Sequence, residues 1–185
     1  MRIIAGRFKG RSLRSPASGN IRPTSDRLRE SLFNVLAHAY GDPAKGARVL
    51  DLFAGTGALG IEALSRGAAF VCFVEEAAEA RGLIKENIEL LGLAGQSKVF
   101  RRDATRMGHA HPNEPFSLIF CDPPYGKNLA PEALSSAIAG GWVTIDALVI
   151  IEERADVVIE LPTGLVLLEQ RIYGDTQMIF ARFEG

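Results

Sequence analysis

The chain has 185 residues and a mass of 20.0 kDa, which is the usual size of one domain. Its formal net charge is −1 and 47% of its residues are hydrophobic, so it can bury a full core and is not a basic nucleic-acid binder by bulk charge. The charge is uneven, however, because residues 1–30 carry eight Arg or Lys and only two acids, a net charge of +6. This asymmetry predicts a basic arm that meets an anion.

The cysteines, histidines and apolar runs narrow the class of protein. Cys72 and Cys121 lie inside apolar runs, which predicts reduced core residues and a cytoplasmic protein. The three histidines have no metal-ligand spacing, so we expect no metal site. The basic amino terminus lacks the apolar segment of a signal peptide, and no apolar run is long enough to span a membrane. We therefore expect no membrane partner.

The first element in the chain is the basic segment 1–16, which contains Gly6 and Gly10. We expect it to form a hairpin or an extended arm. Thr24 or Ser25 can then cap a helix that runs to about Tyr40, with leucines every four residues on its apolar face. Arg27 and Arg29 are expected on the opposite face, where they can meet RNA.

A strand followed by a glycine-rich loop comes next. Residues 48–53, which read Arg-Val-Leu-Asp-Leu-Phe, predict a buried strand that leads directly into Gly55-Thr-Gly57-Ala-Leu-Gly60. A helix of small and apolar residues follows to about Arg66. This is the G-x-G-x-x-G pattern in the strand-loop-helix context that a nucleotide-binding loop requires. Gly55 and Gly57 allow the backbone to approach a ligand closely, and Gly60 allows close packing of helix on strand.

Strands and helices then alternate. The apolar residues 69–74 predict a second strand that ends at Glu75, eighteen residues after Gly57, where an acid can bind the hydroxyls of a ribose. Glu76 is the alternative, but strand alternation favours Glu75. The remaining predicted elements are a helix at 77–91, strands at 97–101 and 116–121, a helix at 131–139, a strand at 147–151, and an antiparallel pair at 165–173 and 177–183. This order predicts an α/β domain with a doubly wound, mostly parallel sheet and an antiparallel carboxyl-terminal strand.

The most informative stretch is Phe116-Ser-Leu-Ile-Phe-Cys-Asp-Pro-Pro-Tyr125, where a buried strand ends at an acid, two prolines and an aromatic ring. The prolines stiffen the loop as it leaves the sheet. Asp122 and the Pro123 carbonyl can accept the two hydrogens of an exocyclic amine, and Tyr125 can stack on the ring that carries this amine. An ordinary proline turn is the alternative interpretation of the same residues.

The acids near the loops favour one cofactor over another. A glycine loop and a ribose-binding acid suit both a dinucleotide and S-adenosylmethionine. Asp51 and Asp103 lie at the ends of the first and third strands, and no basic residue lies in the glycine loop to offset a phosphate. Carboxylates repel a pyrophosphate and attract a sulfonium and an ammonium. We therefore favour S-adenosylmethionine as the cofactor.

These motifs resemble the class I methyltransferases that modify exocyclic amines and, more narrowly, the RsmD family of bacterial 16S ribosomal RNA guanine-N2 methyltransferases. The narrower resemblance covers nearly the whole chain through the segments 2–7, 22–34, 84–88 and 173–176. It implies a Rossmann-like class I methyltransferase fold, in which residues 41–185 form the catalytic domain. Residues 1–40 would then form a basic RNA-binding extension packed on it, and we expect a monomer.

The resemblance also implies an activity: direct transfer of a methyl group from S-adenosylmethionine to the N2 amine of one guanine in 16S ribosomal RNA, within the small subunit or its assembly intermediate. The catalytic residues that we predict are Asp122, Pro123 and Tyr125. The cofactor-binding residues that we predict are Asp51, Phe53, Gly55, Thr56, Gly57, Gly60, Glu75, Asp103, Ala104 and Asp122. The RNA-binding residues that we predict are Arg2, Arg7, Lys9, Arg11, Arg14, Arg22 and Arg27.

Three other functions stay open at this point. An adenine-N6 or cytosine-N4 nucleic-acid methyltransferase would use the same loop on another amine. A protein glutamine methyltransferase usually carries Asn, rather than the Asp122 of this chain, at the start of that loop. A catalytically idle RNA-binding assembly factor belongs to a different class, and it would bind RNA tightly without methylating it.

Overall fold

The computed structural model describes residues 1–16 and 25–185. Within them, seven strands form one sheet in the order β3-β2-β1-β4-β5-β7-β6. Strands β1 to β5 are parallel, and β7 runs antiparallel to both of its neighbours. The strands are β1 (Arg48–Leu52), β2 (Phe70–Val74), β3 (Ser97–Phe100), β4 (Phe116–Cys121), β5 (Val143–Arg154), β6 (Leu165–Tyr173) and β7 (Thr176–Phe183). This order confirms the predicted doubly wound fold with an antiparallel carboxyl-terminal strand.

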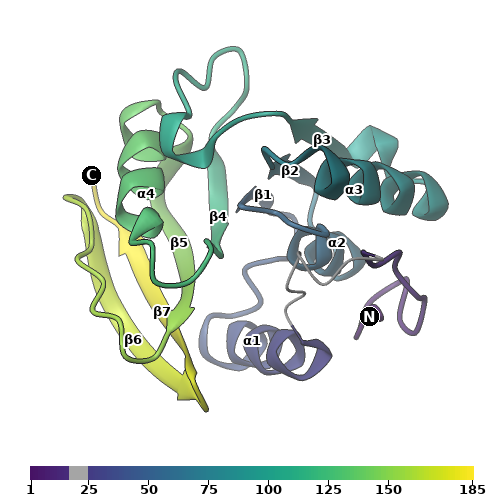
Figure 1. Ribbon diagram of the computed structural model, residues 1–185, viewed down its shortest axis with the longest axis horizontal. Helices are drawn as coiled ribbons and strands as arrows, with labels where there is room; N and C mark the ends of the chain where they lie inside the picture. The colour runs from purple at the N-terminus through teal and green to yellow at the C-terminus, as the bar shows by residue number, and fades with distance from the viewer. Residues whose placement is uncertain (17–24) are drawn as a thin grey trace.

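Helices cover both faces of this sheet (Figure 1). They are α1 (Asp26–Ala39), α2 (Ala58–Ser65), α3 (Ala78–Leu91) and α4 (Leu129–Ala139), with 3-10 turns η1 (Ala94–Gln96) and η2 (Ala104–Arg106). Successive strand residues point to opposite faces, so Val49 joins a core with α1, α2 and α3, whereas Leu50 joins a second core with α4 and η2.

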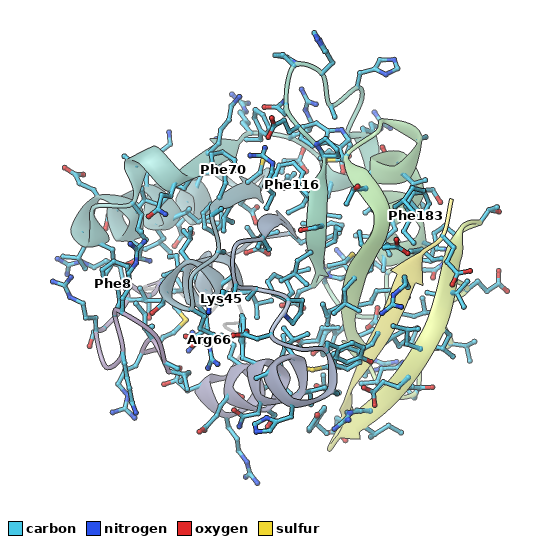
Figure 2. All side chains as sticks on the ribbon, turned by 180° about the vertical axis from the view of Figure 1, so that it is seen from behind. Phe8, Lys45, Arg66, Phe70, Phe116 and Phe183 are labelled. Carbon is cyan, nitrogen blue, oxygen red and sulfur yellow. The ribbon has the colours of Figure 1, made fainter. Side chains whose placement is uncertain are left out.

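An arginine packs against two aromatic rings at the edge of the sheet where the parallel strands begin. The Arg48 guanidinium lies 4.8 Å from the centre of the Phe70 ring and 5.0 Å from that of Phe116, and the two rings are neighbours in Figure 2. In open α/β sheets the opposite edge, where the parallel strands end, is the one at which ligands bind. A ligand site is therefore expected at the carboxyl ends of the strands.

The amino-terminal segment forms the predicted hairpin, in which Arg2 pairs with Ser12 across an antiparallel bridge. Ile3 is buried in the same core as α1, α2 and α3. Gly6 lets this hairpin approach α2 closely, because a Cβ there would lie 1.9 Å from the Ser65 carbonyl oxygen. The hairpin is therefore packed on the α/β domain rather than extended from it.

Helix α2 lies so close to the sheet that only glycine fits at its third position. All eight of its residues are buried. A Cβ on Gly60 would lie 2.4 Å from a carbon of the Phe73 ring, which confirms the packing role predicted for this glycine. The Gly60 N–H also donates to the buried Asp51 carboxylate at 3.0 Å. These two contacts fix the end of the glycine loop that precedes the helix.

A buried carboxylate ties the hairpin to α2. Glu62 is fully buried, and its oxygens accept hydrogen bonds from the backbone N–H groups of Ile4 at 2.8 Å and Ala5 at 3.0 Å. The Arg66 Nε donates to the same carboxylate at 2.8 Å, and Arg29 Nη1 lies 4.0 Å away. One side chain thus binds backbone from the hairpin and guanidinium groups from α1 and from the end of α2.

The burial of Arg29 corrects the expectation that this side chain faces RNA. Arg29 shares a face of α1 with Leu32 and Phe33, which follow it by three and four residues, and it is as fully buried as they are. Its Nη2 donates to the Arg2 carbonyl oxygen at 2.8 Å and to the Asp26 carboxylate. Arg29 therefore holds α1 against the hairpin.

Most element boundaries agree with the prediction to within two residues, but β5 is longer than expected. The predicted strand covers 147–151, whereas β5 extends to Arg154 because β7 pairs with it as far as Thr176. The extension contains two acids, Glu152 and Glu153, which lie at the carboxyl end of β5 and are both buried. At α1, Ser25 is the cap, since its side chain accepts the Leu28 N–H; Thr24 lies outside the described residues.

Replacing Glu62 by alanine is expected to lower the free energy of unfolding by about 3–5 kcal/mol. Its part-buried donors would lose their acceptor, and the fully buried Arg29 would lose a nearby negative charge. Urea unfolding measures this change. The matched control is Glu86→Ala, which removes an exposed glutamate of α3 and should stay within about 0.5 kcal/mol of the wild type. A loss below about 1 kcal/mol for Glu62→Ala would show that the hairpin is held by other contacts.

Replacing Asp51 by asparagine is expected to remove a pH dependence of stability. Burial raises the pKa of Asp51 to about 8, while the hydrogen bond from Gly60 acts in the opposite direction. An unfolded aspartate titrates near about 3.9, so the folded chain binds this proton more tightly. The stabilisation is therefore complete below about pH 4 and is lost as the pH rises through about 8.

Urea unfolding at several pH values tests this expectation. Between about pH 4 and 8, the free energy of unfolding of the wild type should fall relative to that of the Asp51→Asn variant. Taking the difference between the two proteins cancels the titration of all other groups. A difference that stays constant over this range would mean that Asp51 titrates normally in the folded protein.

Candidate functional site

The carboxyl ends of the parallel strands open into a cleft of about 1160 Å³. Its walls come from the glycine loop, the ends of β2 to β5, the first turns of α1 and the turn that leads into β7. Most predicted site residues line it together: Asp51, Phe53, Gly55, Thr56, Glu75, Asp103, Ala104, Asp122, Pro123 and Tyr125. Gly57 and Gly60 lie behind this wall, at the N-cap and in the first turn of α2.

The glycine loop and the acid after β2 form one unit. Gly55 and Gly57 have positive φ angles of 56° and 77°, a backbone conformation that glycine adopts without strain. The Gly55 N–H donates to one oxygen of Glu75 at 2.8 Å, and the Ala77 N–H donates to the other oxygen at 2.8 Å. Two backbone contacts therefore orient Glu75 in the cleft, whereas Glu76 is exposed at its margin.

The charges of two acids in the cleft differ. Hydrogen bonds from the hydroxyl and the N–H of Thr105, at 2.7 and 2.9 Å, lower the pKa of Asp103, so this carboxylate is ionised at neutral pH. Burial raises the pKa of Asp51 to about 8, so this group binds a proton more readily than an exposed aspartate does. Of the two acids, Asp103 therefore carries the firmer negative charge, while the carboxyl of Asp51 is bonded to Gly60.

The loop after β4 is anchored to β5 and β7 through its aromatic residue. The Tyr125 hydroxyl donates to Glu152 Oε1 at 2.5 Å and lies 3.2 Å from Thr176 Oγ1. Burial, followed by the hydrogen bond to Glu152, raises the pKa of Tyr125, so its hydroxyl stays protonated at neutral pH. Glu153 holds the next residue, because it accepts the Gly126 N–H at 3.1 Å. The ring is therefore fixed at its polar end.

Two glutamates that hold this loop, Glu152 and Glu153, were not predicted from the sequence. The signal was present, because an acid follows or ends each apolar strand run, as at Asp51, Glu75 and Asp122, and Glu152 follows the run 147–151 in the same way. The apolar run appears complete at its last isoleucine, and the three-residue extension of β5 beyond it depends on pairing with β7. Glu152 lines the cleft and is 7% exposed.

The predicted RNA-binding residues lie in two groups. The side chains of the hairpin are exposed: Arg2, Arg7, Lys9, Arg11 and Arg14. Arg27, at the start of α1, is exposed and also lines the cleft. Arg22 lies outside the described residues. Two further cations that the sequence analysis did not select, Arg102 and Lys127, line the cleft as well.

Other features bear on the remaining expectations. Both cysteines are buried and unpaired, as predicted. In the parts of the chain that the structure describes, no group of three or more His, Cys, Asp or Glu side chains could hold a metal ion. None of the described helices is long and apolar enough to cross a membrane.

Comparison with known proteins gives a consistent family. The family model described as Conserved hypothetical protein 95 matches residues 1–182. Ribosomal RNA small subunit methyltransferase D of Escherichia coli (strain K12) is 41% identical over 157 residues, which cover 84% of this chain and 76% of that protein. The protein of the same name from Haemophilus influenzae is 35% identical over 176 residues, covering 94% and 89%.

The solved structures agree with this assignment. The structure of yhhF from Escherichia coli matches with a TM-score of 0.84 and 31% identity, and the match covers 100% of this chain and 98% of that one. Similarity to solved methyltransferases confirms the predicted class I methyltransferase fold. The chain therefore belongs to the Conserved hypothetical protein 95 family, the RsmD family that its motifs resemble.

Proposed function

We propose that this chain transfers a methyl group from S-adenosylmethionine to the N2 amine of a guanine in small-subunit ribosomal RNA, within the subunit or its assembly intermediate. The observation that carries the proposal is that one cleft joins the glycine loop to the Asp122-Pro-Pro-Tyr125 loop. The relatives whose names state methylation of small-subunit ribosomal RNA support the same substrate class.

The half of the cleft at the glycine loop fits S-adenosylmethionine. Gly55 lets the backbone lie close to the amino-acid part, and the ionised Asp103 suits a positively charged ligand. Glu75 is oriented for the ribose hydroxyls by its two backbone contacts. Phe53 and Ala104 supply apolar surface in the same cleft. When bound, the cofactor supplies an electrophilic methyl group.

The other half of the cleft fits a flat base with an exocyclic amine. Asp122 and the Pro123 carbonyl can accept the two amine hydrogens, which favours a tetrahedral nitrogen whose lone pair is available for attack. The Tyr125 ring offers a stacking surface, and base–aromatic stacking contributes about 1–3 kcal/mol per base. The contribution of these residues is orientation of the amine rather than covalent catalysis.

The exposed hairpin cations suit the phosphates of a folded RNA. Arg27 lies where the basic surface meets the cleft, so it can contact the backbone next to the target base. On this proposal, residues 1–40 act as an RNA-binding extension and 41–185 as the catalytic domain, although one hydrophobic core joins the two.

The proposed function is tested by incubating the purified protein and S-adenosylmethionine with small subunits from a strain that lacks the gene. Mass spectrometry of nuclease digests should then identify N2-methylguanosine at one position. Methyladenosine or methylcytidine would replace the proposal by one of the nucleic-acid alternatives. Tight binding of subunits with no methyl transfer would favour an idle assembly factor.

Replacing Asp122 by alanine is expected to lower the single-turnover methylation rate by about a hundredfold or more. The amine nitrogen gains positive charge as it attacks, so its contact with the carboxylate strengthens in the transition state. Calorimetry should show almost unchanged affinity for S-adenosylmethionine, because on this proposal the Asp122 carboxylate faces the base, and its predicted contact with the cofactor adds little. The control Asp156→Ala removes an exposed acid outside the cleft and should keep the normal rate. A near-normal rate for Asp122→Ala would mean that the loop is an ordinary turn.

Replacing both Lys9 and Arg11 by alanine is expected to weaken subunit binding and to make it less sensitive to salt. Each lost phosphate contact should reduce the slope of log K against log salt by about 0.7–0.9. Binding measured between about 50 and 200 mM salt tests this expectation. Arg182→Ala, which removes an exposed cation of β7, is the control and should leave the slope unchanged. An unchanged slope for the double variant would exclude Lys9 and Arg11 as RNA contacts.

A further inference from the structure

A second carboxylate lies beside the proposed amine-binding acid. Strands β4 and β5 are parallel neighbours with Cys121 opposite Ile151, so Asp122 and Glu152 follow at the same level on the two strands. Neighbouring strands are about 4.8 Å apart. Both side chains line the cleft, and both also border a small void beneath it. Two acceptor groups therefore stand next to each other at the position proposed for the target base.

The pairing of these acceptors distinguishes between nucleobases. Guanine presents two neighbouring donors on its Watson–Crick edge, the N1–H and the N2 amine. Adenine and cytosine each present an amine next to a ring nitrogen that accepts hydrogen bonds. A flipped base is read through this edge, and two adjacent carboxylates match only the edge with two donors. Against adenine or cytosine, one carboxylate would face a lone pair.

Glu152 has the capacity for this contact. It is almost fully buried, and its position is fixed because its Oε1 accepts the Tyr125 hydroxyl. A carboxylate has roughly four acceptor sites, so a bond from tyrosine does not exhaust it. The same contact places Glu152 next to the ring on which the base would stack. The Tyr125 ring and the two acids then surround one base from its face and its edge.

We propose that Glu152 accepts the N1–H of the target guanine and so selects guanine over other amine-bearing bases. This inference rests on the proposed function, and it adds the residue that sets base specificity. Asp122 acts on the amine that is methylated, whereas Glu152 acts on the neighbouring ring nitrogen. Loss of Glu152 should therefore change which base is accepted, in addition to any change in rate.

The probe is 2-aminopurine, which keeps the C2 amine but has an N1 that accepts hydrogen bonds. It replaces the methylated guanine in small subunits that are reconstituted with ligated RNA. Wild-type protein should methylate the guanine substrate roughly 10- to 100-fold faster, the value of a hydrogen bond to a charged group. Equal rates on the two substrates would overturn the inference without use of any variant.

The variant Glu152→Gln tests the residue directly. Its amide oxygen can still accept the Tyr125 hydroxyl, while its NH2 group can donate to N1 of 2-aminopurine. The preference for guanine should fall to about threefold or less. The control Glu153→Gln changes the neighbouring acid, which does not line the cleft, and keeps both Glu152 and its bond from Tyr125. It should therefore retain the preference even if its rates fall.

The outcomes separate two failures. If the Glu152→Gln variant keeps the wild-type preference while both rates fall, Glu152 only supports the loop and the inference is wrong. If the wild type methylates no guanine at all, the proposed function fails before specificity is reached. Because the preference is a ratio within each protein, a loss of stability in a variant does not imitate the expected result.

Discussion

The site depends on how firmly α2 is held, because the glycine loop is the segment that leads into this helix. The buried Glu62 of α2 binds two backbone N–H groups of the hairpin and the Arg66 guanidinium, and these part-buried donors would lose their common acceptor without it. Such a contact is strongly destabilising to break, although it adds little net stability over an apolar replacement. Its effect is therefore to fix one arrangement of the hairpin, α1 and the glycine loop.

The same constraint holds the proposed RNA-binding surface and the proposed cofactor-binding surface together. Arg29, on the buried face of α1, donates a hydrogen bond to the hairpin. Arg27, two residues earlier on the exposed face of the same helix, lines the cleft. The first turn of α1 therefore cannot move independently of either surface. The proposed division at residue 40 separates an RNA-binding segment from a catalytic segment. The two segments share one hydrophobic core, which contains both Leu32 and Val49. A rigid connection of this kind suits an enzyme that must place one base of a large RNA beside a small cofactor.

The sequence predicted what depends on local signals and missed what depends on register. Apolar runs, glycines and the cap at Ser25 placed the elements, and Gly60 identified the contact between helix and strand. Arg29 was misassigned because a charged residue was expected at the surface, although its spacing from Leu32 and Phe33 places it on the buried face. Glu152 follows an apolar run as other acids of the site do, but its role was missed because its neighbours in space are set by the pairing of β5 with β4 and β7.

The anchoring of Tyr125 bears on how the loop could act. Its hydroxyl is bonded to Glu152 and close to Thr176, and the next residue is bonded to Glu153, so contacts within the protein orient the ring without any base. A loop that is ordered in advance loses less conformational entropy when the base enters, and more of the stacking energy then remains to offset unstacking. The carbonyl and carboxylate acceptors of the same loop are fixed with it. Preorganised polar groups of this kind stabilise a developing positive charge without reorienting during the reaction.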